Sequence, residues 1–169
     1  MADNPVPSLV AQLADLLRAR GWFLASAESC TGGLIAAACT ELAGSSDWFE
    51  RGIVSYSNPA KVALLDVPQR LIDSHGAVSE AVARAMAEGI QRSSGVDLAV
   101  AVTGIAGPGG GTAAKPVGTV WFGFAVRQRD GRVEIGSEHR HFDGDRGQVR
   151  TATVQHALRG ILQRAQAAA

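Results

Sequence analysis

The 169-residue sequence has little cysteine, no excess of charge and no long apolar run, and each shortage excludes a class of protein. Its two cysteines, Cys30 and Cys39, fit neither a metal-ligand spacing nor a disulfide framework, so we expect reduced thiols and no bound metal. Sixteen basic residues balance sixteen acidic ones without a run of one sign, which argues against nucleic acid as a partner. No apolar stretch approaches the ~20 residues that span a bilayer, and the first residues lack a basic segment followed by an apolar one. We therefore expect no membrane association and a cytoplasmic location.

The sequence contains a regular alternation of helical and strand-like segments. Amphipathic stretches with recognisable starts and ends alternate with short apolar runs that are typical of buried strands. These patterns predict helices over residues 8–20, 33–42, 60–66, 69–74, 79–93 and after the 143–145 cap, and strands over residues 22–27, 48–57, 98–102, 117–126 and 132–142. This order predicts an α/β fold, a three-layer α/β/α sandwich around a mixed, mainly parallel sheet. The length and the 46% apolar content indicate one domain over residues 1–169.

The last two predicted strands flank Asp130-Gly131, a pair favoured in tight hairpin turns. We therefore expect these two strands to be antiparallel and to end the sheet. Their exposed edge, near residues 132–142, could pair with a second copy of the chain to form a homodimer.

The stretch from Ala27 to Gly33 is the predicted reactive corner, because it places a serine and a thiol between a strand and a helix start. Such a corner puts side chains at the sheet edge and leaves the first helical N–H groups unpaired, which suits a nucleophile beside an anion site. Ser29 is the candidate nucleophile and Cys30 its main competitor. The N–H groups of Thr31, Gly32 and Gly33 are the candidate donors to an oxyanion.

Lys61 is the best candidate base for Ser29, since none of the four histidines is well placed. Asn58 as N-cap and Pro59 at the first helical position predict that Lys61 lies in the first turn of a helix. The helix dipole and burial would both lower its pKa, so that a neutral amine could take the serine proton. Tyr56 could orient or relay that proton, while a solvated surface lysine is the simpler alternative.

A glycine-rich segment from Gly104 to Gly111 follows the strand that delivers Thr103 to the same predicted edge. Backbone N–H groups of such a segment can approach a phosphate or an oxyanion closely, and we select Gly104, Gly107 and Gly109 as contacts. The segment matches neither the phosphate-binding loop nor the dinucleotide fingerprint, so a plain loop or a lid is the alternative. Lys115 and Arg146 are candidate partners of an anion nearby.

Six segments, in this order, resemble the CinA C-terminal family: residues 28–33, 56–61, 76–79, 102–108, 115–120 and 144–146. The resemblance covers nearly the whole chain, from Leu9 to Leu162. That family includes nicotinamide-nucleotide amidases, which convert nicotinamide mononucleotide and water to nicotinate mononucleotide and ammonia in pyridine nucleotide recycling. It also includes fusions to a molybdopterin-binding-like domain, so this chain looks like the stand-alone form.

The resemblance implies a serine amidase that uses a small nucleotide substrate and no cofactor. Ser29 would be the nucleophile, Lys61 and Tyr56 its activating partners, and Thr103 a polar contact beside them. The chemistry of phosphate binding, rather than the resemblance, suggests that Arg146 and the glycine segment would hold the phosphate. Two alternatives stay open: a non-catalytic nucleotide-binding or regulatory module, and an amidase for another small amide.

Overall fold

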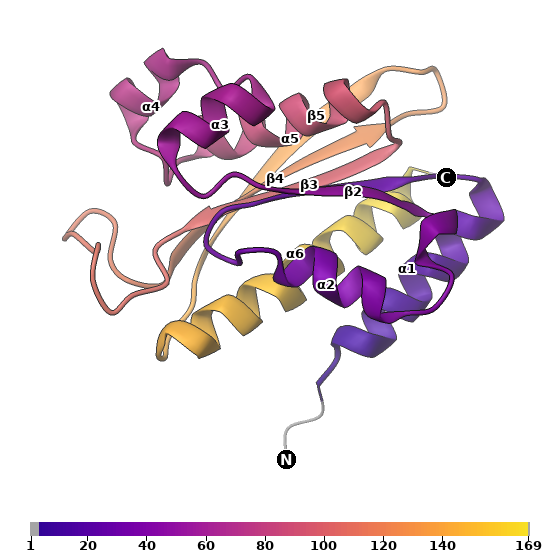
Figure 1. Cartoon of the computed structure of the whole chain (residues 1–169), viewed down its shortest axis with the longest axis horizontal. Coiled ribbons are helices and arrows are strands. Elements are labelled where there is room, and N and C mark those ends of the chain that lie inside the picture. Colours follow the sequence, from indigo (N-terminus) through magenta and orange to yellow (C-terminus); the bar gives the residue numbers. More distant parts are fainter. Residues whose placement is uncertain (1–3, 169) are drawn as a thin grey trace.

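A computed structural model describes residues 4–168 of the chain and shows a central sheet with helices on both faces (Figure 1). The helices are α1 (Val6–Arg20), α2 (Leu34–Glu41), α3 (Asn58–Leu65), α4 (Gln69–His75), α5 (Glu80–Ser94) and α6 (Arg146–Ala167), with a short 3₁₀ helix, η1, at Ser45–Asp47. The strands are β1 (Leu24–Glu28), β2 (Phe49–Val54), β3 (Leu98–Gly104), β4 (Thr119–Arg127) and β5 (Val133–His141). No helix within this described range is long and apolar enough to cross a membrane.

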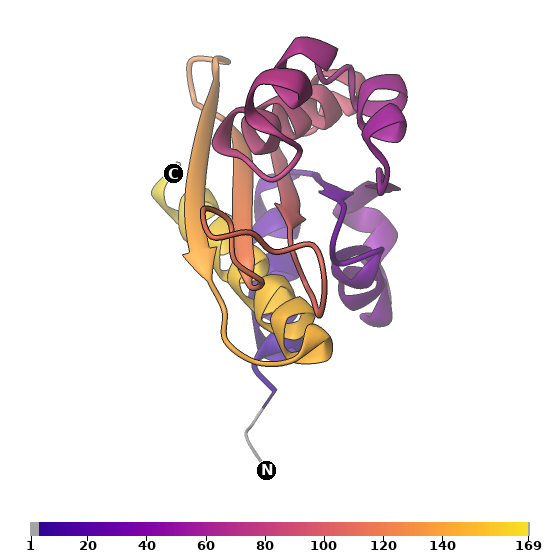
Figure 2. The same ribbon diagram turned by 90° about the vertical axis from the view of Figure 1, so that its left-hand side faces the viewer.

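The strands form one sheet in the order β2-β1-β3-β4-β5. Strand β1 pairs in parallel with β2 and β3, whereas β4 is antiparallel to both β3 and β5, so β4 alone runs against the others. Helices α1, α2 and α6 cover one face, and α3, α4 and α5 cover the other (Figures 1 and 2). The predicted three-layer sandwich with a mixed, mainly parallel sheet is confirmed.

The two faces of β3 differ in side-chain size, and this difference sets how closely the helices approach. Leu98, Val100 and Val102 face the layer of α1 and α6, while Ala99 and Ala101 face α5. Helix α5 crosses the sheet so closely that a Cβ at Gly123 would lie 2.0 Å from the Ala83 carbonyl oxygen. Only glycine fits at that crossing.

Two local predictions need correction. Ser57, rather than Asn58, is the N-cap of α3, because its side chain accepts a hydrogen bond from the Ala60 N–H at 3.1 Å. Strand β4 ends at Arg127 and β5 begins at Val133, each one residue later than predicted, and the Gln128 N–H donates to the Arg132 carbonyl at 2.7 Å at the base of the connection. Neither change moves the flanking elements out of their predicted order.

The carboxyl ends of β1, β2 and β3 meet at one edge of the sheet, because Glu28 is in register with Val54 and with Val102. The pairing continues one residue further: the Ser29 N–H donates to the Val102 carbonyl at 3.1 Å, and the Ser55 N–H donates to the Glu28 carbonyl at 2.8 Å. Ser29 is therefore held between the ends of its two neighbouring strands.

Candidate active site

A pocket of about 240 Å³ opens at this edge of the sheet and brings together all four predicted catalytic residues. Ser29, Tyr56, Lys61 and Thr103 line it, together with Gly104 and Arg146, which were selected as binding residues. These residues come from four separate parts of the sequence, so their convergence is a product of the strand order.

A polar contact in the pocket joins Lys61 Nζ to Ser29 Oγ, at 3.0 Å. Both residues are buried, with 1% of Lys61 and 8% of Ser29 exposed. The Lys61 amine also donates to two backbone carbonyls, those of Ser55 at 3.0 Å and Tyr56 at 3.3 Å. The distance of 3.0 Å between Lys61 Nζ and Ser29 Oγ is short enough for direct proton transfer.

Burial lowers the pKa of Lys61 from its ordinary value. Among the described residues, no carboxylate lies within ion-pair distance of its amine, and the residue sits in the first turn of α3, near the positive end of the helix. A neutral amine has two N–H donors and one lone pair. The two carbonyls can hold both donors, which leaves the lone pair for the proton of the Ser29 hydroxyl.

Glu28 already occupies the helix N-terminus at which the sequence predicts an anion site. Its buried carboxylate accepts from the Ile35 N–H at 2.8 Å, the Ala36 N–H at 3.0 Å and the Thr31 hydroxyl at 2.7 Å. Glu28 was not among the predicted site residues. An internal carboxylate here leaves no room for a substrate anion at the start of α2.

The predicted donor at Gly32 needs correction, while those at Thr31 and Gly33 stay predictions. None of the three lines the pocket. The Gly32 N–H donates to the Ser29 carbonyl at 3.0 Å, which closes the turn on itself, and the Thr31 hydroxyl is committed to Glu28. No acceptor for the Thr31 N–H lies within residues 4–168. Of the three predicted N–H donors, that of Gly32 is thus already bound to a backbone carbonyl.

Arg150, which the sequence analysis missed, holds the turn from its other side. Its Nε donates to the Cys30 carbonyl at 3.1 Å and its Nη2 to the Thr31 carbonyl at 3.2 Å. A signal was present in the sequence, since Arg146 and Arg150 lie four residues apart and so share one face of a helix. Their distance in sequence from Ser29 gave no hint of the contact.

The side chain of Tyr56 does not contact Lys61 or Ser29, as the predicted proton relay would require. The residue is 58% exposed, and its hydroxyl is 3.1 Å from Arg146 Nη2, while only its backbone carbonyl contacts Lys61. Arg146 also donates to the Gly107 carbonyl at 2.9 Å, so it joins the glycine segment to the loop after β2. The tyrosine side chain thus belongs to the mouth of the pocket.

The remaining predicted contacts divide between the pocket and its surroundings. Thr103 donates through its hydroxyl to the Ala77 carbonyl at 2.9 Å and stays within the pocket wall. Gly107 and Gly109 do not line the pocket, and Gly109 is exposed. Lys115 donates to the His75 carbonyl at 2.6 Å, away from Arg146. The glycine segment therefore reaches the pocket through Gly104 and through the Gly107–Arg146 bond.

Cys30 is poorly suited to compete with Ser29. Burial, with a further contribution from the charge of Glu28, raises the pKa of the Cys30 thiol to about 11. A thiol reacts as its thiolate, and very little thiolate exists near neutral pH when the pKa is that high. Cys39 is also fully buried, and burial raises its pKa to about 12.

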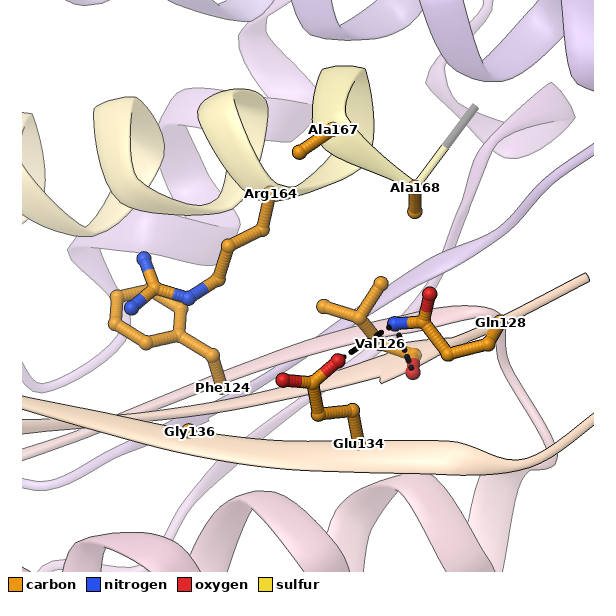
Figure 3. Close-up of a pocket in the computed structure, with 8 residues that line it drawn as sticks. All are labelled: Phe124, Val126, Gln128, Glu134, Gly136, Arg164, Ala167 and Ala168. Atoms are coloured by element: carbon orange, nitrogen blue, oxygen red, sulfur yellow. Dashed lines mark hydrogen bonds between the residues drawn. The ribbon is translucent and has the colours of Figure 1, made fainter.

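A second hollow, of about 200 Å³, lies at the opposite end of the sheet, between the β4–β5 hairpin and the end of α6 (Figure 3). Phe124 and Val126 form its apolar floor, and Arg164 and Glu134 flank it. It contains no serine, threonine, cysteine or lysine side chain. Across residues 4–168, no group of three potential metal ligands is close enough to hold an ion.

Comparisons with known proteins identify relatives along nearly the whole chain. The CinA C-terminal domain family matches residues 7–165. The chain is 49% identical over 162 residues to the nicotinamide-nucleotide amidohydrolase PncC of Enterobacter agglomerans, covering 96% of each chain. It is 54% identical over 160 residues to a putative competence-damage inducible protein of Symbiobacterium thermophilum, covering 92% of this chain and 37% of that one. The crystal structure of the competence/damage inducible protein CihA from Agrobacterium tumefaciens superposes with a TM-score of 0.88 at 42% identity, covering 96% of this chain and 97% of that one.

Proposed function

The chain belongs to the CinA C-terminal domain family, and on that premise we propose that it is a hydrolase of nicotinamide mononucleotide. The products are nicotinate mononucleotide and ammonia, as in pyridine nucleotide recycling. The observation that carries the proposal is the buried contact of 3.0 Å between Lys61 Nζ and Ser29 Oγ, inside a pocket that also contains an arginine. A serine and an amine at this distance form a nucleophile with its base.

The first half of the reaction forms an acyl-enzyme. Neutral Lys61 takes the Ser29 hydroxyl proton as Oγ attacks the carboxamide carbon, and the carbonyl oxygen becomes an oxyanion. The Lys61 ammonium then gives that proton to the departing nitrogen, so the C–N bond breaks and ammonia leaves. The nicotinoyl group of the nucleotide is left as an ester on Ser29.

The second half releases the product by the same proton path. A water molecule enters the space that ammonia has left, and Lys61 takes its proton as the water oxygen attacks the ester carbon. The proton then returns to Ser29 Oγ as the ester bond breaks, and nicotinate mononucleotide leaves. Water and proton transfer supply all the chemistry, so the mechanism uses no cofactor.

Arg146 is the candidate partner of the substrate phosphate. Its guanidinium lies at the mouth of the pocket, where Nη1 and Nη2 donate to the Gly107 carbonyl and the Tyr56 hydroxyl. A phosphate oxygen is a stronger acceptor for arginine than either neutral group. Tyr56 and Thr103 would then help to position the substrate, one at the mouth and one in the wall.

Ammonia release tests the proposal directly. The wild-type chain is expected to release ammonia from nicotinamide mononucleotide and far less from free nicotinamide, which lacks the phosphate. The Ser29→Ala variant should lose about 10⁴-fold or more in kcat, since removing a nucleophile from a catalytic unit abolishes that route. Full activity in this variant would exclude Ser29 as the nucleophile.

Two other functions remain as outcomes of the same experiment. Binding of nicotinamide mononucleotide without ammonia release, in the wild type as well as the variant, would favour a nucleotide-binding or regulatory module. Equal turnover of nicotinamide and its mononucleotide would favour an amidase for small amides in general.

A further inference from the structure

The two peptide groups that follow Ser29 have N–H donors with no acceptor in the described part of the chain. The direction of these N–H groups, which belong to Cys30 and Thr31, depends on what holds the peptide planes. Glu28 already binds the first N–H groups of α2, so the helix end cannot supply them to a substrate. The donors nearest to the reacting carbonyl are therefore those of the turn itself.

The direction of the Thr31 N–H is fixed by the carbonyl on the same peptide. In a trans peptide the C=O and the N–H point in opposite directions. The Cys30 carbonyl accepts from Arg150 Nε at 3.1 Å, and it has no other donor within residues 4–168. The Thr31 carbonyl, by contrast, also accepts from the Leu34 N–H at 3.1 Å. The Cys30–Thr31 peptide thus depends on Arg150 for its orientation.

We propose that Arg150 is a positioning residue for catalysis, which fixes the turn that follows Ser29 and so sets the direction of its free N–H groups as donors to the oxyanion. The proposal rests on the amidase function proposed above. The guanidinium fork holds two successive carbonyls and so fixes two peptide planes at once. Its positive charge also polarises these peptides, which strengthens their N–H groups as donors to an oxyanion.

Helix α6 thereby contributes two arginines to the site. Arg146, in its first turn, reaches the mouth of the pocket, and Arg150, one turn later, reaches the peptide groups behind the nucleophile. The two arginines should have separable effects. Loss of a phosphate contact weakens substrate binding, whereas loss of oriented oxyanion donors slows the chemical step.

Steady-state kinetics of Arg150→Lys and Arg150→Met provide the test. We expect kcat to fall about 10- to 100-fold with KM changed less than about threefold, a smaller loss than the ~10² to 10³ caused by removing an oxyanion donor itself. Guanidinium chloride, far below denaturing concentrations, should restore part of kcat in Arg150→Ala. The matched control is Arg159→Met, on the exposed side of the same helix, which should leave kcat and KM unchanged.

A second readout needs no nicotinamide substrate. A fluorophosphonate probe should label Ser29 in the wild type and label the Arg150 variants about 10- to 100-fold more slowly, because phosphonylation also develops an oxyanion. Labelling without ammonia release in the wild type would reject the proposed substrate but leave the role of Arg150 standing.

Three results would overturn the inference: unchanged kcat and labelling rates in folded Arg150 variants, a rise in KM alone, or no labelling of wild-type Ser29. If Arg150→Met does not fold, Arg150→Lys and the guanidinium rescue decide.

Discussion

The two pockets at opposite ends of the sheet are similar in volume, about 240 and 200 Å³. They differ in whether their cationic side chain has a carboxylate partner. At the far end, Arg164 bonds Glu138 at 2.8 Å and lies 3.8 Å from the centre of the Phe124 ring, and Glu134 accepts from Gln128 at 3.1 Å (Figure 3). At the carboxyl ends of β1 and β3, the Lys61 amine is buried against a hydroxyl and two carbonyls.

Our proposal of the reactive site therefore rests on the buried amine without a counter-charge, and the volume of the pocket does not distinguish the two ends. Burying a charge without a counter-charge lowers the stability of the folded state, and the group responds by losing its proton. In the proposed mechanism, the lowered pKa of Lys61 makes it the base for Ser29. At Arg164 the charge is neutralised and stacked, which serves packing.

Removing the Lys61 amine should give the largest effect among variants that keep Ser29. Lys61→Met is expected to lower kcat by about 10²- to 10⁴-fold, the usual contribution of a general base. Lys61→Arg is the matched control for charge, because arginine keeps the cation but does not lose a proton near neutral pH. Substantial activity in Lys61→Arg would mean that the site needs the charge and not the base.

The pH profile of kcat/KM tests the same contrast without a mutation. Only neutral Lys61 accepts the serine proton, so activity should rise about tenfold per pH unit below the pKa of Lys61 and level off above it. Because burial lowers that pKa, the plateau should begin below 10.5, the ordinary value for lysine. A flat profile across this range would contradict a lysine base.

Arg146→Met should raise KM for nicotinamide mononucleotide about 10- to 100-fold, since a hydrogen bond to a charged group contributes ~1.5–3 kcal/mol. Nicotinamide riboside, which has no phosphate, is the matched substrate, and its KM should change little. An equal rise for both would place Arg146 away from the phosphate.

The smallest effect on activity is expected at the far pocket. Arg164→Met should leave kcat and KM unchanged while lowering the free energy of unfolding by about 1 kcal/mol, because partly buried Glu138 loses a bonding partner. Urea denaturation and ammonia release on the same preparation would measure both. A change in kcat would mean that the two pockets are coupled.

Local sequence patterns predicted the elements and the meeting of strand ends, because helix spacing, caps and apolar runs are short-range signals. The distance between Lys61 and Ser29 follows from one helix start and one strand end, both visible in the sequence. The roles of Glu28 and Arg150 were not predictable in this way. Each depends on which of several polar groups reaches a given N–H or carbonyl after the layers have packed.

The direction of the Tyr56 side chain was also not predictable from the sequence. Tyr56 was expected at the end of a strand over residues 48–57, but it lies in the loop beyond β2, where its side chain contacts Arg146 and its carbonyl contacts Lys61. Alternation along a strand cannot decide this, because β2 ends at Val54 and the direction of Tyr56 is set by the loop that follows.

Mass spectrometry of the enzyme, quenched during turnover of nicotinamide mononucleotide, tests most directly whether Ser29 is the nucleophile. We expect an adduct equal to the substrate minus ammonia, located by fragmentation on Ser29 and released by hydroxylamine. An adduct on Cys30, or full turnover by Ser29→Ala, would contradict this role of Ser29.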